Sequence, residues 1–494
     1  MRKTAAMLLF SGVSTLSLAQ EKEIKFTEYD LDNGMHVILH QDNSNPIVAV
    51  SIMYHVGSKN ENPERTGFAH FFEHLMFEGS QNIDRGEFSR LVEMNGGVLN
   101  ANTSQDRTYY YEILPSNQLE LGLWLESERL LHAKVDSVGI ETQREVVKEE
   151  KRQRIDNQPY GSFMAKAFSM MFQEHPYQWT PIGSMEHLDA AQEEDYINFY
   201  KTFYVPNNAT LSIAGDISIE ETKALIEKYF ASIPSGEKLN AYRDLVNLPA
   251  NKVAEKYKLK EKKIKKALAK TPAEVAYKKL FKNVSETQIP IPQPTQVEAP
   301  LSGVLTDTVY DNIQLPALFA CYRMPAQNSP DFYSVQMMNE ILSGGSSSRL
   351  NKSVVEKDQL AMTMFSFPFP LEHPGMALIL GIANSGVSLD KLQQGMDKEV
   401  ARLQTELISD AEYEKIQNSF ESNFYSSNST MAGIAEALAN NYVYFGNTNL
   451  INNELEKYKK VTKEDIRQAA IKYFTPERRI LLYYLPKENN EEEK

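Results

Sequence analysis

The sequence predicts a mixed α/β fold in two homologous halves, and three observations support that prediction. Strand-like runs such as His36–Asp42 are interspersed with amphipathic helices such as Ile219–Phe230. The segment Asp195–Leu211 aligns without gaps to Asp465–Leu481, and a proline-rich stretch lies between the two copies. The length of 494 residues, about three times that of a typical domain, also indicates more than one domain.

The elements of the first half follow from local patterns. Runs rich in β-branched and aromatic residues indicate strands at His36–Asp42, Ile47–Val56, Thr108–Pro115 and Ala209–Asp216. Apolar residues at helical spacing indicate helices at Arg65–Phe77, Asp84–Met94, Gln118–Leu131, Ser137–Asp156 and Ile219–Phe230. Gly96 and Gly97 end the second of these helices, and Pro234 follows the last.

A duplication accounts for the second half. Both copies of the first aligned segment contain a helix, a Phe/Tyr pair, a proline turn and a strand, at a constant offset of 270 residues. Phe68–Ser80 likewise aligns to Tyr333–Gly345 at an offset of 265. Two matched segments in the same order indicate one copy of a domain on each side of the linker. The alternative is chance similarity between amphipathic helices.

Between the copies the composition changes. Asn251–Asn283 holds twelve lysines and three glutamates, which favours a solvated helical insertion, with a basic docking surface for an acidic partner as the alternative. Four prolines between Ser285 and Gly303 predict a semi-rigid extended linker. We therefore expect domains at residues 20–237 and 304–487, the insertion and linker at 238–303, and an acidic tail at 488–494.

Residues 1–19 are typical of a cleavable signal peptide. Arg2 and Lys3 precede the mostly apolar stretch Ala5–Leu18, and small residues stand before a cleavage point at Gln20. We therefore expect an exported, periplasmic protein, the alternative being a short buried helix. No cysteine follows the cleavage point to carry a lipid, and no later segment reaches the ~18 apolar residues of a membrane span.

Composition excludes several classes of protein. Hydrophobic residues make up 42% of the chain and aromatic residues 10%, enough to bury substantial cores. The single cysteine, Cys321, excludes an intrachain disulfide and any site that needs several cysteines. The formal charge of −14 argues against a nucleic-acid-binding protein.

The segment Gly67–Ser80 carries the most informative chemistry. His70 and His74 are four residues apart, so on a helix they lie on one face and can share a metal ion. Glu73 lies beside them, where it can accept a proton from a water molecule that zinc has made acidic. This H-x-x-E-H order is the reverse of the commoner zinc-protease motif. The alternative is an ordinary helix with two half-buried histidines.

A catalytic zinc ion takes three protein ligands, so a third should lie downstream. The helix around ETQREVVKEEK offers Glu145, Glu149 and Glu150. If Val146 and Val147 mark its inward stripe, Glu150 lies one turn further along that stripe and Glu149 points about 100° away. Glu150 is therefore the predicted ligand, and the alternative is that these glutamates are solvated and the ligand lies elsewhere.

These residues resemble the inverted-motif zinc peptidases of the pitrilysin/insulysin group, which includes mitochondrial processing peptidase. Matching segments are HLMFEGS, REVVKEE, Gly96–Pro115, His175–Gly183 and ATLSIAGD, so the resemblance covers most of the chain. It implies an α/β (α+β) fold of two homologous domains, each a mostly antiparallel sheet covered by helices, that together form half of a clamshell.

The resemblance also implies roles for particular residues. His70, His74 and Glu150 would bind one zinc ion per chain, and Glu73 would be the general base. Asn100 and Ala101 match the strand that pairs with the backbone of a peptide substrate, a form of recognition that tolerates many side chains.

The chain departs from the family pattern in three places. A supporting glutamate seven residues before the third ligand is replaced by Gln143. At the 265 offset the motif residues map onto Val335, Met338 and Asn339, which predicts that the second half binds no zinc. An Arg and a Tyr seven residues apart, which contact the substrate carbonyl in the family, are replaced by Val355 and Met362, and the nearby Arg349 has no Tyr at that spacing.

The sequence therefore predicts a zinc-dependent endopeptidase for peptides or unfolded segments. Because the Arg/Tyr pair is missing, we expect a homologous partner subunit to supply it. Two alternatives stay open: a non-catalytic structural or assembly subunit, and a peptide-binding chaperone with a structural zinc ion.

Overall fold

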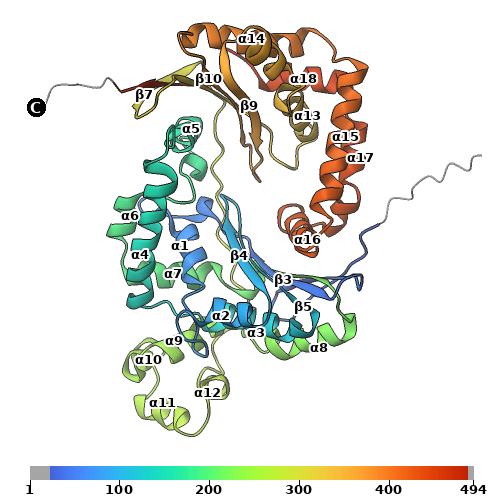
Figure 1. Ribbon diagram of the computed structural model, residues 1–494. Coiled ribbons are helices and arrows are strands. Elements are labelled where there is room, and N and C mark those ends of the chain that lie inside the picture. The colour runs from blue at the N-terminus through green and yellow to red at the C-terminus, as the bar shows by residue number, and fades with distance from the viewer. Residues whose placement is uncertain (1–22, 488–494) are drawn as a thin grey trace, which may run out of the picture.

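The computed structural model describes residues 23–487 (Figure 1). The predicted signal peptide at residues 1–19 and the acidic tail at 488–494 lie outside the described residues. The first half of the chain lies below the second half in Figure 1, and each half contains one sheet with helices packed on it. The predicted α/β class with two mixed sheets is therefore confirmed, whereas the domain boundaries stay a prediction.

The first sheet has six strands in the order β1-β2-β6-β3-β5-β4. They span Thr27–Asp30 (β1), His36–Gln41 (β2), Ile47–Tyr54 (β3), Val98–Thr103 (β4), Thr108–Pro115 (β5) and Ala209–Gly215 (β6). Only β2 and β6 run parallel, and every other pair of neighbours is antiparallel. All four strands that the sequence predicts for this half are present.

The second sheet repeats this plan with five strands in the order β7-β11-β8-β10-β9. They span Leu305–Asp311 (β7), Ala317–Arg323 (β8), Ala361–Phe369 (β9), Met376–Ala383 (β10) and Ile480–Pro486 (β11). Again one pair, β7 and β11, runs parallel and the others are antiparallel. Cys321 lies fully buried on β8. Both sheets are therefore mostly antiparallel, as the family resemblance implies.

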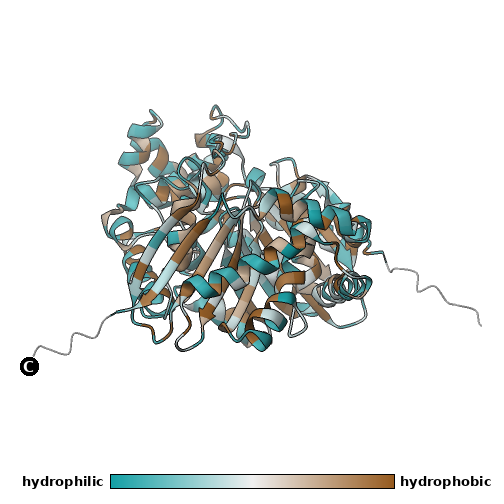
Figure 2. Cartoon of the chain, turned by 90° about the horizontal axis from the view of Figure 1, so that it is seen from above, coloured by the Kyte–Doolittle hydropathy of each residue, from teal (hydrophilic) through white to brown (hydrophobic). Residues whose placement is uncertain are grey.

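Helices cover the sheets. Those of the first half are α1 (Phe68–Leu75), α2 (Glu87–Met94), α3 (Leu119–His132), α4 (Ser137–Lys151), α5 (Phe163–Met171), α6 (Met185–Ala190), α7 (Glu193–Phe203) and α8 (Ile219–Phe230). Those of the second half are α13 (Phe332–Ser343), α14 (Leu389–Thr405), α15 (Asp410–Ser427), α16 (Met431–Phe445), α17 (Glu454–Lys460) and α18 (Lys463–Tyr473). In Figure 2 the central strands are mainly brown, while the helices alternate teal and brown, as amphipathic helices do.

The predicted repeat takes the same structure in both halves. In the first copy α7 leads through a proline turn into β6, and in the second α18 leads through a proline turn into β11. The shorter alignment pairs α1 with α13. Equivalent segments thus form equivalent elements, which supports duplication over chance similarity.

Each half donates one helix to the sheet of the other. Phe168 and Met171 of α5 pack in one hydrophobic cluster with Phe319 and Leu482 of the second sheet. In return α16 packs on the first sheet, with its Ile434 and Leu438 in one cluster with Ile38 and Ala214. Helix α5 follows α4 in the first half, and α16 follows α15 in the second. The exchange is therefore reciprocal, and it ties the two halves together (Figure 1).

The region between the halves forms four helices and then a linker that contains no helix or strand. Its helices are α9 (Gly236–Asn247), α10 (Ala250–Lys256), α11 (Glu261–Leu268) and α12 (Ala273–Leu280). Residues 285–302 contain no helix or strand. Glu298 of the linker accepts hydrogen bonds from the backbone N–H groups of Gln173, Glu174 and His175, at 2.8–2.9 Å, which fixes the linker to the first half.

Within residues 23–487, no helix combines the length and the hydrophobicity needed to cross a bilayer.

Candidate metal centre

Helix α1 begins later than the sequence predicts. Arg65–Phe77 was expected to be helical, but the helix starts after Gly67, whose φ of 98° lies in the left-handed region. The buried carboxylate of Glu61 accepts hydrogen bonds from the N–H groups of Gly67 and Ala69, at 2.9 and 2.8 Å. Glu61 therefore supplies partners for the free N–H groups at the start of the helix, and it fixes where the helix begins.

Three predicted ligands converge at this helix. His70 and His74 lie one turn apart on α1, and their Nε2 atoms are 3.3 Å apart. Glu150, near the end of α4, places Oε2 at 3.5 Å from Nε2 of His70 and 3.0 Å from Nε2 of His74. The candidate ligand atoms of these three residues all lie within 4.8 Å of one another.

This geometry fits zinc. Zinc–nitrogen and zinc–oxygen bonds of about 2.0–2.2 Å in a tetrahedral arrangement place the ligand atoms roughly 3.3–3.5 Å apart. The observed separations of 3.0–3.5 Å agree with that requirement. Two histidines and one glutamate are also a ligand set that zinc hydrolases use, with a fourth position left for water.

The structure places Glu150 beside both histidines, but the helix face on which its choice rested was partly wrong. Val147 is fully buried, but Val146 is 43% exposed, so the inward stripe of α4 is not centred between them. Glu150 lies one turn beyond Val147 and still faces α1. Glu149 and Glu145 point outward, where they pair with Arg152 and Lys148. The burial of Val147 alone is what identifies the correct face.

Glu73 is held by a residue that the sequence argument missed. Thr103, at the end of β4, donates a hydrogen bond of 2.6 Å from its hydroxyl to Oε2 of Glu73. Burial raises the pKa of Glu73 above its ordinary value, and the hydrogen bond from Thr103 opposes that rise. The sequence could have indicated Thr103, because side chains alternate between the two faces of a strand and Thr103 therefore shares a face with Ala101 two residues earlier.

Burial also determines the charge state of His70. It lowers the pKa of His70 to about 4, and the neighbouring His74 acts in the same direction. The imidazole is therefore neutral at neutral pH, which is the form that binds a metal ion.

Asn100 and Ala101 lie on the edge strand of the first sheet. Strand β4 pairs with β5 on one side, where Asn100 faces Tyr111 and Ala101 faces Tyr110. The strand order places no described strand on its other side. The side chain of Asn100 is exposed. Because β4 also carries Thr103, its free edge runs beside the helix that holds Glu73.

The departures from the family pattern have structural counterparts. Gln143 donates a hydrogen bond of 2.5 Å to the buried carboxylate of Glu78, so it supports the end of α1 without adding a charge. Arg349 binds Glu412 through two nitrogens, at 2.7 and 3.2 Å, and its side chain is 7% exposed. Arg349 is thus occupied inside its own domain.

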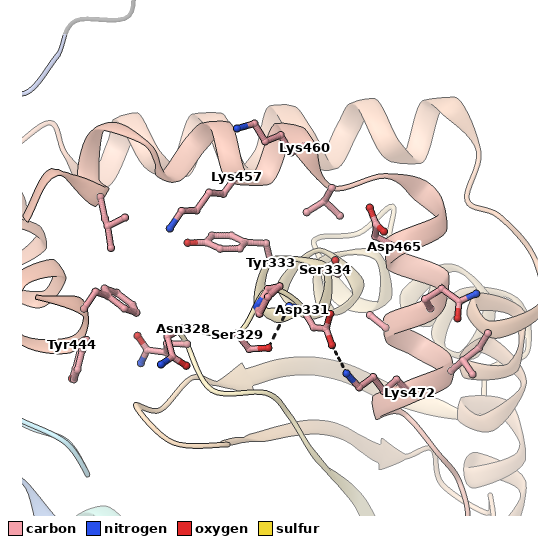
Figure 3. A pocket seen from close by; sticks show the side chains of 18 residues that line it. Asn328, Ser329, Asp331, Tyr333, Ser334, Tyr444, Lys457, Lys460, Asp465 and Lys472 are labelled. Carbon is pink, nitrogen blue, oxygen red and sulfur yellow. Dashed lines mark hydrogen bonds and ion pairs between the residues drawn. The ribbon is translucent and has the colours of Figure 1, made fainter. Parts of the chain in front are cut away.

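A cavity of about 860 Å³ lies in the second half, between α13, α16, α17 and α18. Figure 3 shows Lys457 and Lys460 on one side of it and the ion pair between Asp331 and Lys472 on another. None of the converging residues on α1 and α4 lines this cavity. The cluster around His70 is therefore the stronger candidate for a reaction centre.

Comparisons with known proteins agree with the fold. Residues 36–181 match the family model described as Insulinase (Peptidase family M16), and residues 190–420 match the model described as Peptidase M16 inactive domain. The chain belongs to peptidase family M16. The predicted resemblance is therefore confirmed, and the family membership covers both halves.

Named relatives of this M16 chain include proteases. It is 26% identical over 458 residues to zinc protease PqqE of Helicobacter pylori, an alignment that covers 92% of both chains. It is 29% identical over 211 residues, 42% of its length and 46% of the relative, to the probable mitochondrial-processing peptidase subunit beta of Schizosaccharomyces pombe. The crystal structure of a protease from Helicobacter pylori superposes with a TM-score of 0.79 at 26% identity, covering 94% of this chain and all of that one.

Proposed function

We propose that this chain is a zinc-dependent endopeptidase that cleaves peptides or unfolded segments. The observation that carries the proposal is the convergence of His70, His74 and Glu150 beside Glu73. Helices α1 and α4 supply the three ligands, and one zinc ion per chain would be held there. Relatives named zinc proteases support the same metal and the same reaction class.

The site suggests how its residues would act. An extended peptide adds to the free edge of β4 at Asn100 and Ala101, which places its backbone beside α1. Zinc, when bound, polarises a water molecule and lowers the pKa of that water towards neutrality. Glu73 takes a proton from the attacking water and passes it to the amine nitrogen that leaves. Thr103 holds the carboxylate of Glu73 in position through its hydroxyl.

The two alternatives explain less of the site. A structural subunit has no need of a half-buried carboxylate beside three candidate metal ligands, because removing such groups from water costs free energy. A chaperone with a structural zinc ion would account for the edge strand but would leave Glu73 without a task. The peptidase uses every member of the cluster.

We further propose that the chain acts as the catalytic subunit of a heteromeric pair, with the active site at the subunit interface. Five of the six arginines between residues 304 and 487 bind groups within the chain, as the side chains of Arg323, Arg349, Arg402, Arg467 and Arg479 do. A related chain with an intact Arg/Tyr pair would complete the site. The predicted signal peptide would place this chain in the periplasm, so the partner would be an exported chain as well.

The substitution Glu73→Gln tests the proposed reaction. A neutral amide cannot take the proton, so turnover of an unstructured peptide should fall about 10²–10⁴-fold. Bound zinc, measured by elemental analysis, and the unfolding temperature should stay unchanged. Glu93→Gln, an exposed carboxylate on α2, is the matched control and should keep full activity. Near-normal turnover by the Glu73 variant would show that the assigned base is wrong.

A further inference from the structure

The lysine-rich insertion is a folded module. Helices α10, α11 and α12, here called the lysine module (residues 250–283), form a small hydrophobic core of their own with α9. Val253, Ile264 and Leu280 are among its buried members. Figure 1 shows the module projecting from the lower end of the first half, away from the second half. The residues of the expected insertion thus form three helices that share a hydrophobic core with α9.

The module is fixed firmly to the first domain. Asp244 on α9 binds Lys201 of α7, Lys256 at 2.7 Å and the hydroxyl of Tyr257 at 2.6 Å. The neighbouring Arg243 is buried and donates to two backbone carbonyls of the domain core, both at 2.6 Å. A surface that binds the module would therefore hold the whole chain in one orientation.

The charge of the module is opposite to that of the rest of the chain. Twelve lysines and three glutamates give the module +9, which leaves −23 for the other residues of a chain with −14 overall. All twelve lysines are exposed. Only two of them form ion pairs within the described part of the chain, Lys256 with Asp244 and Lys265 with Glu261. Ten ammonium groups are thus available to an external partner.

The lysines are spread over all three helices of a module that projects from the first half (Figure 1). On α11, helical spacing places Lys262 and Lys266 nearly opposite the buried Ile264, and the exposed Lys263 lies about 100° from it. The turn between α11 and α12 carries Lys270 and is flanked by exposed Leu268 and Val275. Cationic side chains around a few exposed apolar ones are typical of peptides that bind at a membrane surface.

We propose that the lysine module docks the protein on an anionic phospholipid surface. The module contains no arginine, and its aromatic residues Tyr257, Tyr277 and Phe281 serve its own core. Protein interfaces are enriched in arginine and exposed aromatic residues and depleted in lysine, so this composition does not fit a protein partner. Dispersed lysines on a projecting module fit a fluid layer of anionic headgroups, which need no matching shape. The acidic remainder of the chain would point away from such a layer.

Co-sedimentation of the full chain with phospholipid vesicles tests the proposal. The chain should bind vesicles of phosphatidylcholine with phosphatidylglycerol, should not bind phosphatidylcholine alone, and should dissociate as salt is added. Changing Lys262, Lys263 and Lys266 together to Gln should weaken binding about 100-fold. All three are exposed and unpaired in the described structure, so the unfolding temperature should not change.

A matched variant controls for net charge. Lys352→Gln, Lys391→Gln and Lys460→Gln together remove the same charge from exposed sites of the second half and should change binding less than twofold. Equal loss in both triple variants, or no binding to phosphatidylglycerol vesicles, would overturn the proposal. Tighter binding to polyglutamate or to a DNA duplex than to these vesicles would also overturn it, and would assign the surface to an acidic protein or to nucleic acid.

Discussion

The two halves of the chain place different chemistry on the same scaffold. In the first half, His70, Glu73 and His74 lie on α1, and Thr103 of the edge strand β4 donates to Glu73. In the second half, the equivalent helix is α13 and the edge strand is β9. There Asn339 stands in place of His74, and its side-chain oxygen accepts a hydrogen bond of 2.6 Å from Ser366 of β9.

This difference shows what the scaffold requires and what it leaves open. Both halves link the helix to the edge strand through a hydroxyl donor. In the second half the acceptor is a neutral amide whose nitrogen donates to the carbonyl of Val335, so the buried polar groups satisfy one another. In the first half the acceptor is a carboxylate beside two imidazoles and Glu150, a set that needs a further partner. The fold is thus compatible with either set of polar residues, and only the set of the first half can hold a metal ion.

Exchanging the residue that differs should have the largest effect. His74→Asn copies the second half into the first and should remove bound zinc and all detectable hydrolysis, since two ligands cannot hold the ion tightly. The reciprocal Asn339→His should gain no zinc, because Val335 and Met338 offer no further ligand. Zinc content of the purified proteins checks both variants. Zinc in the second half of the Asn339 variant would contradict this account of the difference.

A partner chain should have the next largest effect. Arg349 is occupied by Glu412, and the family's Arg/Tyr positions hold Val355 and Met362. Losing one donor to a developing oxyanion costs about 10²–10³ in rate, so a related chain with an intact Arg/Tyr pair should raise peptide hydrolysis by about that factor. The assay compares the isolated chain with the mixture. Full activity of the isolated chain, unaltered by the partner, would point to a substitute donor within this chain.

The two neighbouring glutamates of α4 should differ in their effect on zinc. Glu150 faces both histidines, whereas the side chain of Glu149 is 53% exposed. Glu150→Gln should weaken zinc binding by at least about 10-fold. Loss of a residue that only supports a metal ligand typically weakens metal binding 10–100-fold, and loss of the ligand itself should cost no less. Glu149→Gln should leave zinc affinity unchanged. Competition with a chelator measures both, and equal affinities would refute the assignment of the helix face.

The smallest expected effect is at Thr103. Its hydrogen bond lowers the pKa of Glu73, so Thr103→Val should raise that pKa and move the acid limb of the rate profile to higher pH. A base must be deprotonated to act, so the variant loses most activity at the acid end, with kcat falling about 10-fold. Ser366→Ala is the matched control in the second half. It should leave the pH profile unchanged and cost about 1 kcal/mol of stability.

Local patterns predicted much of the fold. Strands β2, β3, β5 and β6 were predicted from runs of β-branched and aromatic residues, which fit a pleated surface wherever they occur. The ends of elements were harder to predict, because Gly67 and the contact of Glu61 with it decide where α1 begins. The sequence also could not show which of Val146 and Val147 is buried, since both are apolar and only the packing of α4 decides between two neighbours that point about 100° apart.

The sequence by itself determined which residues of α1 share a face. The spacing of His70, Glu73 and His74 places them on one helix face in any fold that contains the helix, and the repeat at a constant offset predicts two similar halves. Only the tertiary structure decided which glutamate reaches the histidines and that Thr103 holds Glu73. It alone also revealed the exchange of α5 and α16 between the sheets. These contacts join residues far apart in the chain, and periodicity reports only which way a side chain points, not which segment packs against it.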